Sequence, residues 1–506
     1  MGCINIVAWL LIAFANNIYI FYLSRAITGL GDACGFATLP AYIAESATPV
    51  VRGLYGNMMM IIMFFGQILA SLAAFSFGSL FAFPSPAIPK LLTGDYKFTM
   101  EQVSYLAVIP AVTMIFASPV FCTVTDKIGR KRTLLISGCS HIIAWLFVAF
   151  SKTLWLFYVS RFFAGLADAL LYAALPTYIA EISTPKIRSL YGNSVVLCIC
   201  LGQFLSNTVG YYLTISMTAF VLLIFPILFL ITFMLMPESP YYLMMIGNEI
   251  SAEQSLQKLR SSDNVQDELR QINADVKRQL SETGYFRDLW LNASNRKAMI
   301  IANFARAFQQ LSGIGALTQY TQYIFLQAGG EISSGAASMI FAGMLVFVNI
   351  FIGVLSDKFG RKRSMIVSCI GCFLILVPLA AYFYLQTNTE VDLSKITWIP
   401  LLGIIIYVLV YSLGLGFVPT IIVGEIFSAS IRKYAVMVSN MIFAFYLCTT
   451  SKLFQVLMSG YGLWVPFLFF GICCFVGAIS SYFIVPETNG KTLEEIQQEL
   501  KGNKEQ

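Results

Sequence analysis

The sequence predicts an all-α membrane protein made of two homologous halves. Of its 506 residues, 58% are hydrophobic and only 11% are charged, whereas soluble domains carry about 25% charged residues. Apolar stretches long enough to cross a hydrocarbon core of about 30 Å follow one another along the chain. Several motifs also occur twice in the same order. So much apolar surface excludes a water-soluble fold.

The apolar stretches predict membrane-spanning helices. The alternating ten-residue segments of a barrel are absent, and a helix satisfies its own backbone hydrogen bonds inside the bilayer. Fourteen spans are expected, at about 4–22, 27–44, 56–82, 102–122, 133–150, 155–178, 189–212, 216–236, 299–326, 333–355, 364–386, 396–423, 434–459 and 463–485.

Basic residues are clustered between these spans. Much of the positive excess lies in DKIGRKR (126–132), PKIR (185–188), DKFGRKR (357–363) and IRK (431–433). Short loops rich in lysine and arginine face the cytoplasm. The net charge of +6 therefore indicates orientation, with both termini in the cytoplasm, and no nucleic-acid partner is expected.

Recurring motifs indicate an internal duplication, since two parallel halves of six spans are a known plan for membrane proteins. The recurring pairs are DKIGRKR and DKFGRKR, Glu181…Arg188 and Glu425…Arg432, and PES (237–239) and PET (486–488). We expect a six-helix bundle over 70–236, a polar helical linker in the cytoplasm over 237–298, a second bundle over 299–485 and a cytoplasmic tail over 486–506.

The first 69 residues repeat part of the first half. Residues 2–70 match residues 138–206 at roughly half of their positions, as in YLSRAITGLGDA (22–33) and YVSRFFAGLADA (158–169). Residues 1–69 are thus a partial duplicate of spans three to five of the first bundle, and they add two helices. The segment is either a real appendage or a gene-fusion artefact.

No cofactor, metal site or enzyme is predicted. The eleven cysteines lie almost entirely in apolar runs, where small buried thiols are expected. The single histidine, His141, argues against a histidine-based metal or hydrolytic site. Neither a nucleophile motif nor a phosphate loop is present.

Six ordered motifs resemble the sugar-porter family of the major facilitator superfamily. They are DKIGRK (126–131), RFFAG (161–165), PESP (237–240), QQLSG (309–313), GVLSDKFGRK (353–362) and PETNGKTLEE (486–495). The set covers residues from about 70 to 497, and within the family the chain is similar to the insect facilitated trehalose transporters. The resemblance implies a major facilitator fold with two six-helix bundles.

The resemblance also implies a gate at the cytoplasmic ends of the helices. Acids and bases there can pair across the two halves when the cytoplasmic side is shut, and a network of pairs can bias a bistable element. The implied gate residues are Asp126, Arg130, Glu181 and Arg188 in the first half, and Asp357, Arg361, Glu425 and Arg432 in the second. The alternative is snorkelling charge that fixes only the topology.

A sugar site needs amides and hydroxyls that replace the water of the sugar, next to apolar surfaces. In the family, the glutamines that match Gln309 and Gln310 contact the sugar, with helix–helix hydrogen bonding as the alternative role. Further candidates for substrate binding are Gln319, Thr420 and Gln203.

The pocket positions depart from the glucose-carrier pattern of the family. Gly315 stands in place of an asparagine, Gln319 of a tyrosine, Thr420 of a tryptophan and Val196 of a glutamine. These changes remove several hexose contacts. They allow a different sugar, a larger disaccharide or a carrier that has lost sugar binding.

Asp168 is an acid inside a predicted span, seven residues after Arg161 and so about 10 Å along a helix. Acids inside a membrane are costly, which makes them functional candidates. Structural pairing with Arg161 or a polar neighbour and proton coupling both stay open. Proton-coupled members of the family carry their acid on the first span, and residues 69–92 contain none.

These features together predict facilitative transport of a sugar, trehalose or a hexose, by alternating access. We expect a multi-pass protein of the plasma membrane whose partners are a small-molecule sugar and the lipid bilayer. A proton-coupled sugar symporter and a non-transporting sugar sensor are the alternatives. Sensors often carry long cytoplasmic tails, and residues 486–506 form a short one.

Overall fold

The structure is a computed structural model. It describes residues 70–93, 96–183, 188–260, 265–281, 284–427 and 429–489, with single positions at 495 and 498. The side chains of residues 188–193, 279–281, 352–359 and 429–430 are not part of this description. The expected duplicate at 1–69 and most of the expected tail lie outside the described residues. All described residues belong to one compact unit, residues 65–506.

Every regular element of the described residues is a helix, and eleven of these helices are long and apolar enough to cross a membrane. The first bundle consists of the span Ala70–Thr93, whose second part is α4 (Pro84–Thr93), and of α5 (Met100–Ile128), α6 (Arg130–Ala149), α7 (Leu154–Ile182), α8 (Arg188–Tyr212) and α9 (Ile215–Met234). Helix α7 packs on α5 and α6, and α6 packs on α9.

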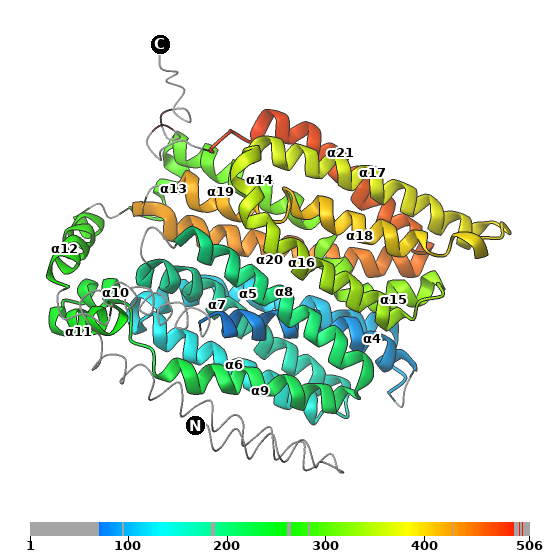
Figure 1. Ribbon diagram of the computed structural model, residues 1–506, viewed down its shortest axis with the longest axis horizontal. Helices are drawn as coiled ribbons and strands as arrows, with labels where there is room; N and C mark the ends of the chain where they lie inside the picture. The colour runs from blue at the N-terminus through cyan, green and yellow to red at the C-terminus, as the bar shows by residue number, and fades with distance from the viewer. Residues whose placement is uncertain are drawn as a thin grey trace, which may run out of the picture. The chain divides into compact units, whose positions relative to one another are not determined.

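Four short helices connect the two bundles, and Figure 1 shows the first three gathered at one end of the long helices. They are α10 (Pro240–Met245), α11 (Glu249–Arg260), α12 (Gln266–Ser281) and α13 (Asp288–Leu291). The expected linker ran to residue 298, but the next helix already begins at Ala293. The side chain of Asn292 caps that helix by accepting a hydrogen bond from the backbone N–H of Ser294, which fixes the earlier start.

The second bundle contains two interrupted spans. It consists of α14 (Ala293–Leu311), α15 (Ile314–Ala328), α16 (Ser334–Phe359), α17 (Arg361–Asn388), α18 (Ile399–Ser412), α19 (Val418–Ile426), α20 (Ala429–Tyr461) and α21 (Trp464–Ile484). The expected span 299–326 is divided at Gly313, whose φ of 91° is a left-handed conformation that glycine adopts at little cost. The expected span 396–423 is divided between α18 and α19.

The two bundles pack against each other along three pairs of helices. Helix α20 packs on α5, α16 on α8, and α15 on α4. In Figure 1 the helices of the first bundle lie on one side and those of the second bundle on the other, with the long axes roughly parallel. Any polar space between the bundles is therefore bounded by helices of both halves.

Candidate functional site

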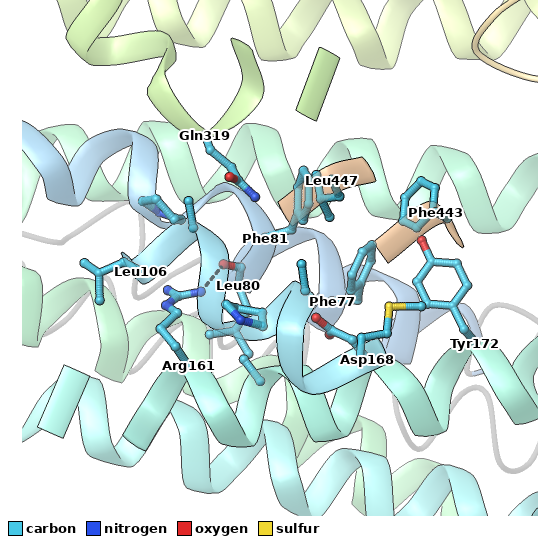
Figure 2. Close-up of a pocket in the computed structure, with 16 residues that line it drawn as sticks. Phe77, Leu80, Phe81, Leu106, Arg161, Asp168, Tyr172, Gln319, Phe443 and Leu447 are labelled. Atoms are coloured by element: carbon cyan, nitrogen blue, oxygen red, sulfur yellow. Dashed lines mark hydrogen bonds between the residues drawn. The ribbon is translucent and has the colours of Figure 1, made fainter. Parts of the chain in front are cut away.

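A small cavity lies between the two bundles. Its polar residues are Arg161, Asp168 and Tyr172 of α7 and Gln319 of α15 (Figure 2). Its apolar wall includes Phe77, Leu80, Phe81, Leu106, Met114, Phe443 and Leu447. The cavity thus combines a few polar groups with a mostly apolar and aromatic lining.

Arg161 reaches the cavity wall because of a proline on another span. Pro84 has no backbone N–H, so the carbonyl of Leu80, four residues earlier, lacks its helical hydrogen-bond donor. The Nη1 atom of Arg161 donates to this carbonyl at 2.7 Å (Figure 2), and the guanidinium lies 4.8 Å from the centre of the Phe83 ring. Arg161 therefore joins α7 to the first span just before α4 begins.

Asp168 lies next to the single histidine of the chain. Its Oδ1 atom is 3.5 Å from Nε2 of His141 on α6, and the His141 side chain is fully buried. Within the described residues, neither ring nitrogen of His141 makes a hydrogen bond. The structure therefore places Asp168 beside a polar neighbour, whereas the hydrogen bond of Arg161 goes to Leu80.

The two adjacent glutamines before the break in the seventh span have different surroundings. The Nε2 atom of Gln309 donates to the carbonyls of Leu415 at 3.0 Å and Gly416 at 3.4 Å, and its Oε1 accepts from Arg306 at 3.1 Å. Gln309 thus joins the break between α14 and α15 to the break between α18 and α19. The Oε1 atom of Gln310 is buried without a hydrogen-bond partner in the described residues.

The other expected binding residues are spread over the structure. Gln319 lines the cavity, and its Oε1 accepts from Ser451 at 3.0 Å. The Oγ1 atom of Thr420 accepts from Arg306 at 3.2 Å, and Gln203 is buried on α8. Among Gln309, Gln310, Gln319, Thr420 and Gln203, only Gln319 is part of the described cavity wall.

Charged residues at the end of the first bundle where α5 meets α6 form a compact cluster. Nη2 of Arg130 is 3.1 Å from Oε1 of Glu181, and Nη1 is 3.6 Å from Oδ1 of Asp126. The Ser239 hydroxyl also donates to Glu181. Glu238 accepts from the backbone N–H of Lys131 at 3.0 Å, where a carboxylate stabilises the start of α6.

The second bundle repeats this arrangement with matching residues. Nη2 of Arg361 is 3.4 Å from Oε1 of Glu425, and the Thr488 hydroxyl donates to Glu425 at 2.6 Å. Glu487 accepts from the backbone N–H groups of Arg361 at 2.7 Å and Lys362 at 3.2 Å. The two halves that repeat in sequence therefore also repeat the same hydrogen bonds at matching residues.

The helix-starting glycines explain why these loops recur. Gly129 and Gly360 have φ values of 98° and 74°, which favour glycine. A Cβ atom would lie 2.4 Å from Glu238 at the first position and 2.6 Å from Glu487 at the second. Each glycine thus gives a carboxylate direct access to a helix N-terminus.

One described ion pair joins the two bundles at this end. Nζ of Lys433 on α20 lies 2.7 Å from Oδ2 of Asp126 on α5. The described pairs of Arg130 with Glu181 and of Arg361 with Glu425 instead lie within their own bundles. Arg432 donates to the carbonyl of Phe427, and the side chains of Arg188 and Asp357 lie outside the description.

Sequence reasoning did not single out several residues of these clusters. Glu238 and Glu487 belong to the repeated PES and PET motifs, and their role at the helix starts could have been predicted because the acid recurs at the same place in both halves. Arg306 could have been found as a basic residue inside an apolar stretch. Tyr172 and Lys433 carry no comparable signal, since their partners lie on other helices.

Two helical bundles with matching loops around a central cavity define a membrane transporter of the major facilitator type. Solved structures of the xylose transporter XylE from E. coli share this fold. The partially occluded inward-open form has a TM-score of 0.70 at 20% identity and covers 85% of this chain and 99% of that chain. The inward-open form has a TM-score of 0.69 at 20% identity, with 86% and 99% covered.

Residues 1–85 and 90–500 match the family described as "Sugar (and other) transporter". The chain belongs to this sugar transporter family, and it is a multi-pass membrane transporter rather than an enzyme.

Named relatives of the chain are trehalose transporters of insects. The facilitated trehalose transporter Tret1 of Polypedilum vanderplanki is 32% identical over 451 residues, which are 86% of this chain and 88% of that protein. Tret1 of Culex quinquefasciatus is 32% identical over 454 residues, with 87% and 86% covered. Trehalose transporter 1 of Drosophila melanogaster is 33% identical over 449 residues, and this chain spans 52% of its length.

Proposed function

We propose that the protein carries a sugar, trehalose or a hexose, across the plasma membrane by facilitated alternating access. The observation that carries this proposal is the cavity between the bundles, with Arg161 and Asp168 on one side and Gln319 on the other. A sugar that bridges the two bundles would couple its own binding to their relative movement. The insect relatives are named for facilitated transport of trehalose, which supports the same substrate class.

The cavity offers both hydrogen-bond donors and hydrogen-bond acceptors. Asp168 provides carboxylate oxygens, Tyr172 a hydroxyl and Gln319 an amide, while Phe77, Phe81 and Phe443 provide aromatic surfaces. A sugar presents hydroxyls at its rim and apolar C–H groups on its ring faces. The lining therefore fits a polyhydroxylated ligand better than a purely apolar one.

The ends of the helices support the alternating-access part of the proposal. At the cytoplasmic end, the pair of Asp126 and Lys433 joins α5 to α20. Toward the opposite end of the same two helices, Nζ of Lys452 donates to the Ser104 hydroxyl at 3.1 Å and lies 4.3 Å from the centre of the Tyr105 ring. We propose that these contacts close the two ends of the cavity in turn, with both termini in the cytoplasm.

Counterflow in proteoliposomes tests this function. Purified protein is reconstituted into vesicles loaded with unlabelled trehalose, glucose or another sugar, and entry of the labelled sugar is followed. Transient accumulation that saturates and needs the matching internal sugar is the expected result. Absence of counterflow for the whole panel, with protein correctly inserted, would refute sugar transport.

A further inference from the structure

Buried arginines of the described residues differ in their partners. Four described arginines are buried: Arg130, Arg161, Arg306 and Arg361. Among the described acids, Asp168 is the buried one. Arg130 and Arg361 pair with Glu181 and Glu425 at the cytoplasmic end. Arg306 forms no ion pair with any described residue, and its hydrogen bonds there go to the neutral residues Gln309 and Thr420.

Half of the Arg306 guanidinium has no acceptor among the described residues. Both of its described hydrogen bonds come from Nη1, and the buried Nε atom has no partner. Arginine stays protonated in proteins, and a buried charge without a counter-charge is costly. The edge formed by Nε and Nη2 is the kind of donor pair to which a carboxylate binds through two parallel hydrogen bonds.

Arg306 lies directly behind one wall of the central cavity. Its guanidinium is 5.4 Å from the centre of the Phe443 ring, and Phe443 lines the cavity together with Tyr172. Figure 2 shows these two rings adjacent to each other at the same end of the cavity, with ring centres 6.0 Å apart. A ligand that displaces the Phe443 ring would therefore meet the guanidinium.

Charge at the cavity is also unbalanced. Arg161 and Asp168 share one wall, and Asp168 lies beside His141. Asp168 is the single acid in the described lining, so it can balance the charge of Arg161 or of Arg306, but not of both. A ligand with one negative charge would supply the missing counter-charge.

We propose that Arg306 forms a carboxylate-binding subsite at the cavity, so that the transporter takes sugar acids in addition to neutral sugars. This inference rests on the proposed sugar transport and names a further substrate class for the same cavity. The carboxylate binds to the open edge of Arg306, and the hydroxyls of the sugar meet the polar groups of the cavity.

The test compares a neutral sugar with its acidic analogue in the same reconstituted protein. Glucuronate and glucose are each tested as inhibitors of counterflow and as labelled substrates, in the native protein and in Arg306→Gln. Arg306→Lys keeps the charge but loses the planar fork. Arg270→Gln removes an exposed arginine of α12 and is the matched control.

Glucuronate is expected to bind the native protein, and Arg306→Gln should weaken its binding by about 10- to 100-fold, as for a lost hydrogen-bonded charge pair. Glucose binding should change by less than about threefold in the same variant, since a neutral ligand gains little from a formal charge. Arg306→Lys should give an intermediate loss, and Arg270→Gln none. Unchanged thermal unfolding of Arg306→Gln would show that the loss is local.

Two outcomes would overturn the inference alone: glucose counterflow without any effect of glucuronate, or equal glucuronate binding by the native protein and Arg306→Gln. Chloride or phosphate that inhibits as strongly as glucuronate would show that the site binds any small anion, and this result would also overturn the inference. If Arg306→Gln weakens glucose and glucuronate equally, Arg306 is a structural residue. Absence of counterflow for neutral sugars would instead count against the proposed function.

Discussion

Lys433 of α20 and Asp126 of α5 form an ion pair of 2.7 Å between the two bundles. Their side chains are 47% and 31% exposed, so water screens the attraction and the pair is worth less than about 1 kcal/mol. Such a small energy still shifts an equilibrium between two states of similar stability. The ion pair is therefore weak enough to break and re-form in every transport cycle.

Lys433→Met is expected to shift the protein toward the inward-open state by up to about fivefold. Cys122 lies one turn before Asp126 on α5, and its labelling rate from the cytoplasmic side, with the other cysteines replaced by serine, reports this opening. Lys277→Met, at an exposed position of α12, is the control. Labelling should return to the native rate in the swapped pair Asp126→Lys with Lys433→Asp, and failure of the swap would argue against the ion pair.

Gln309→Ala and Gln310→Ala should have different consequences. Gln309 is bound on both sides by Arg306 and by the carbonyls of Leu415 and Gly416, so its removal should mainly lower thermal stability, by about 1–3 kcal/mol. Gln310 has a buried Oε1 that finds no partner in the part of the chain that the structure describes. If the sugar supplies that partner, Gln310→Ala should raise the half-saturation constant roughly 5- to 150-fold.

Thermal unfolding and counterflow kinetics of both variants separate these roles. A changed half-saturation constant in Gln309→Ala, with native stability, would move that residue into the binding site. A change in protein abundance alone for Gln310→Ala would make it a packing residue.

Transport is expected to be independent of a proton gradient. The first described span contains no acid between residues 70 and 93, and Asp168 is held 3.5 Å from His141. Uptake into vesicles should therefore be the same with and without an imposed pH difference. Asp168→Asn should lower the rate or the stability without creating a pH response. Accumulation driven by the gradient in the native protein, and lost in this variant, would make Asp168 the coupling site.

The amino-terminal duplicate is expected to be dispensable. The sequence of residues 1–69 copies only part of one bundle, so it cannot form a second cavity between two complete bundles. Deletion of residues 1–55 should leave the rate of counterflow within about twofold of that of the full chain, because both complete bundles remain. Loss of transport with normal membrane insertion would show that the duplicate is a working part.

The spans and the two bundles could be predicted because hydropathy and repeated motifs are local properties of the sequence. The break at Gly313 could not, since a glycine in an apolar run costs only about 1 kcal/mol in a continuous helix and does not by itself end one. The break becomes visible only together with the hydrogen bonds from Gln309 to Leu415 and Gly416. Those partners lie more than a hundred residues away.

The candidate site was predicted less completely than the fold. Repetition of PES and PET could have identified Glu238 and Glu487 as partners of the two helix starts. The cavity wall depends on which face of each helix points inward, and a helix that is apolar on all sides does not reveal that face. This is why Tyr172 and Phe443 were missed, and why Gln319 is the one expected binding residue in the described lining.

Sugar counterflow through the native protein and Gln319→Ala tests the central claim most directly. Gln319 lines the cavity from the second bundle, and Gln386→Ala, on the exposed end of α17, is the matched control. Saturable counterflow of trehalose or a hexose is expected, with a half-saturation constant raised about 5- to 150-fold in Gln319→Ala and unchanged in Gln386→Ala. Counterflow that is absent from the native protein, or identical in all three, would contradict sugar transport through this cavity.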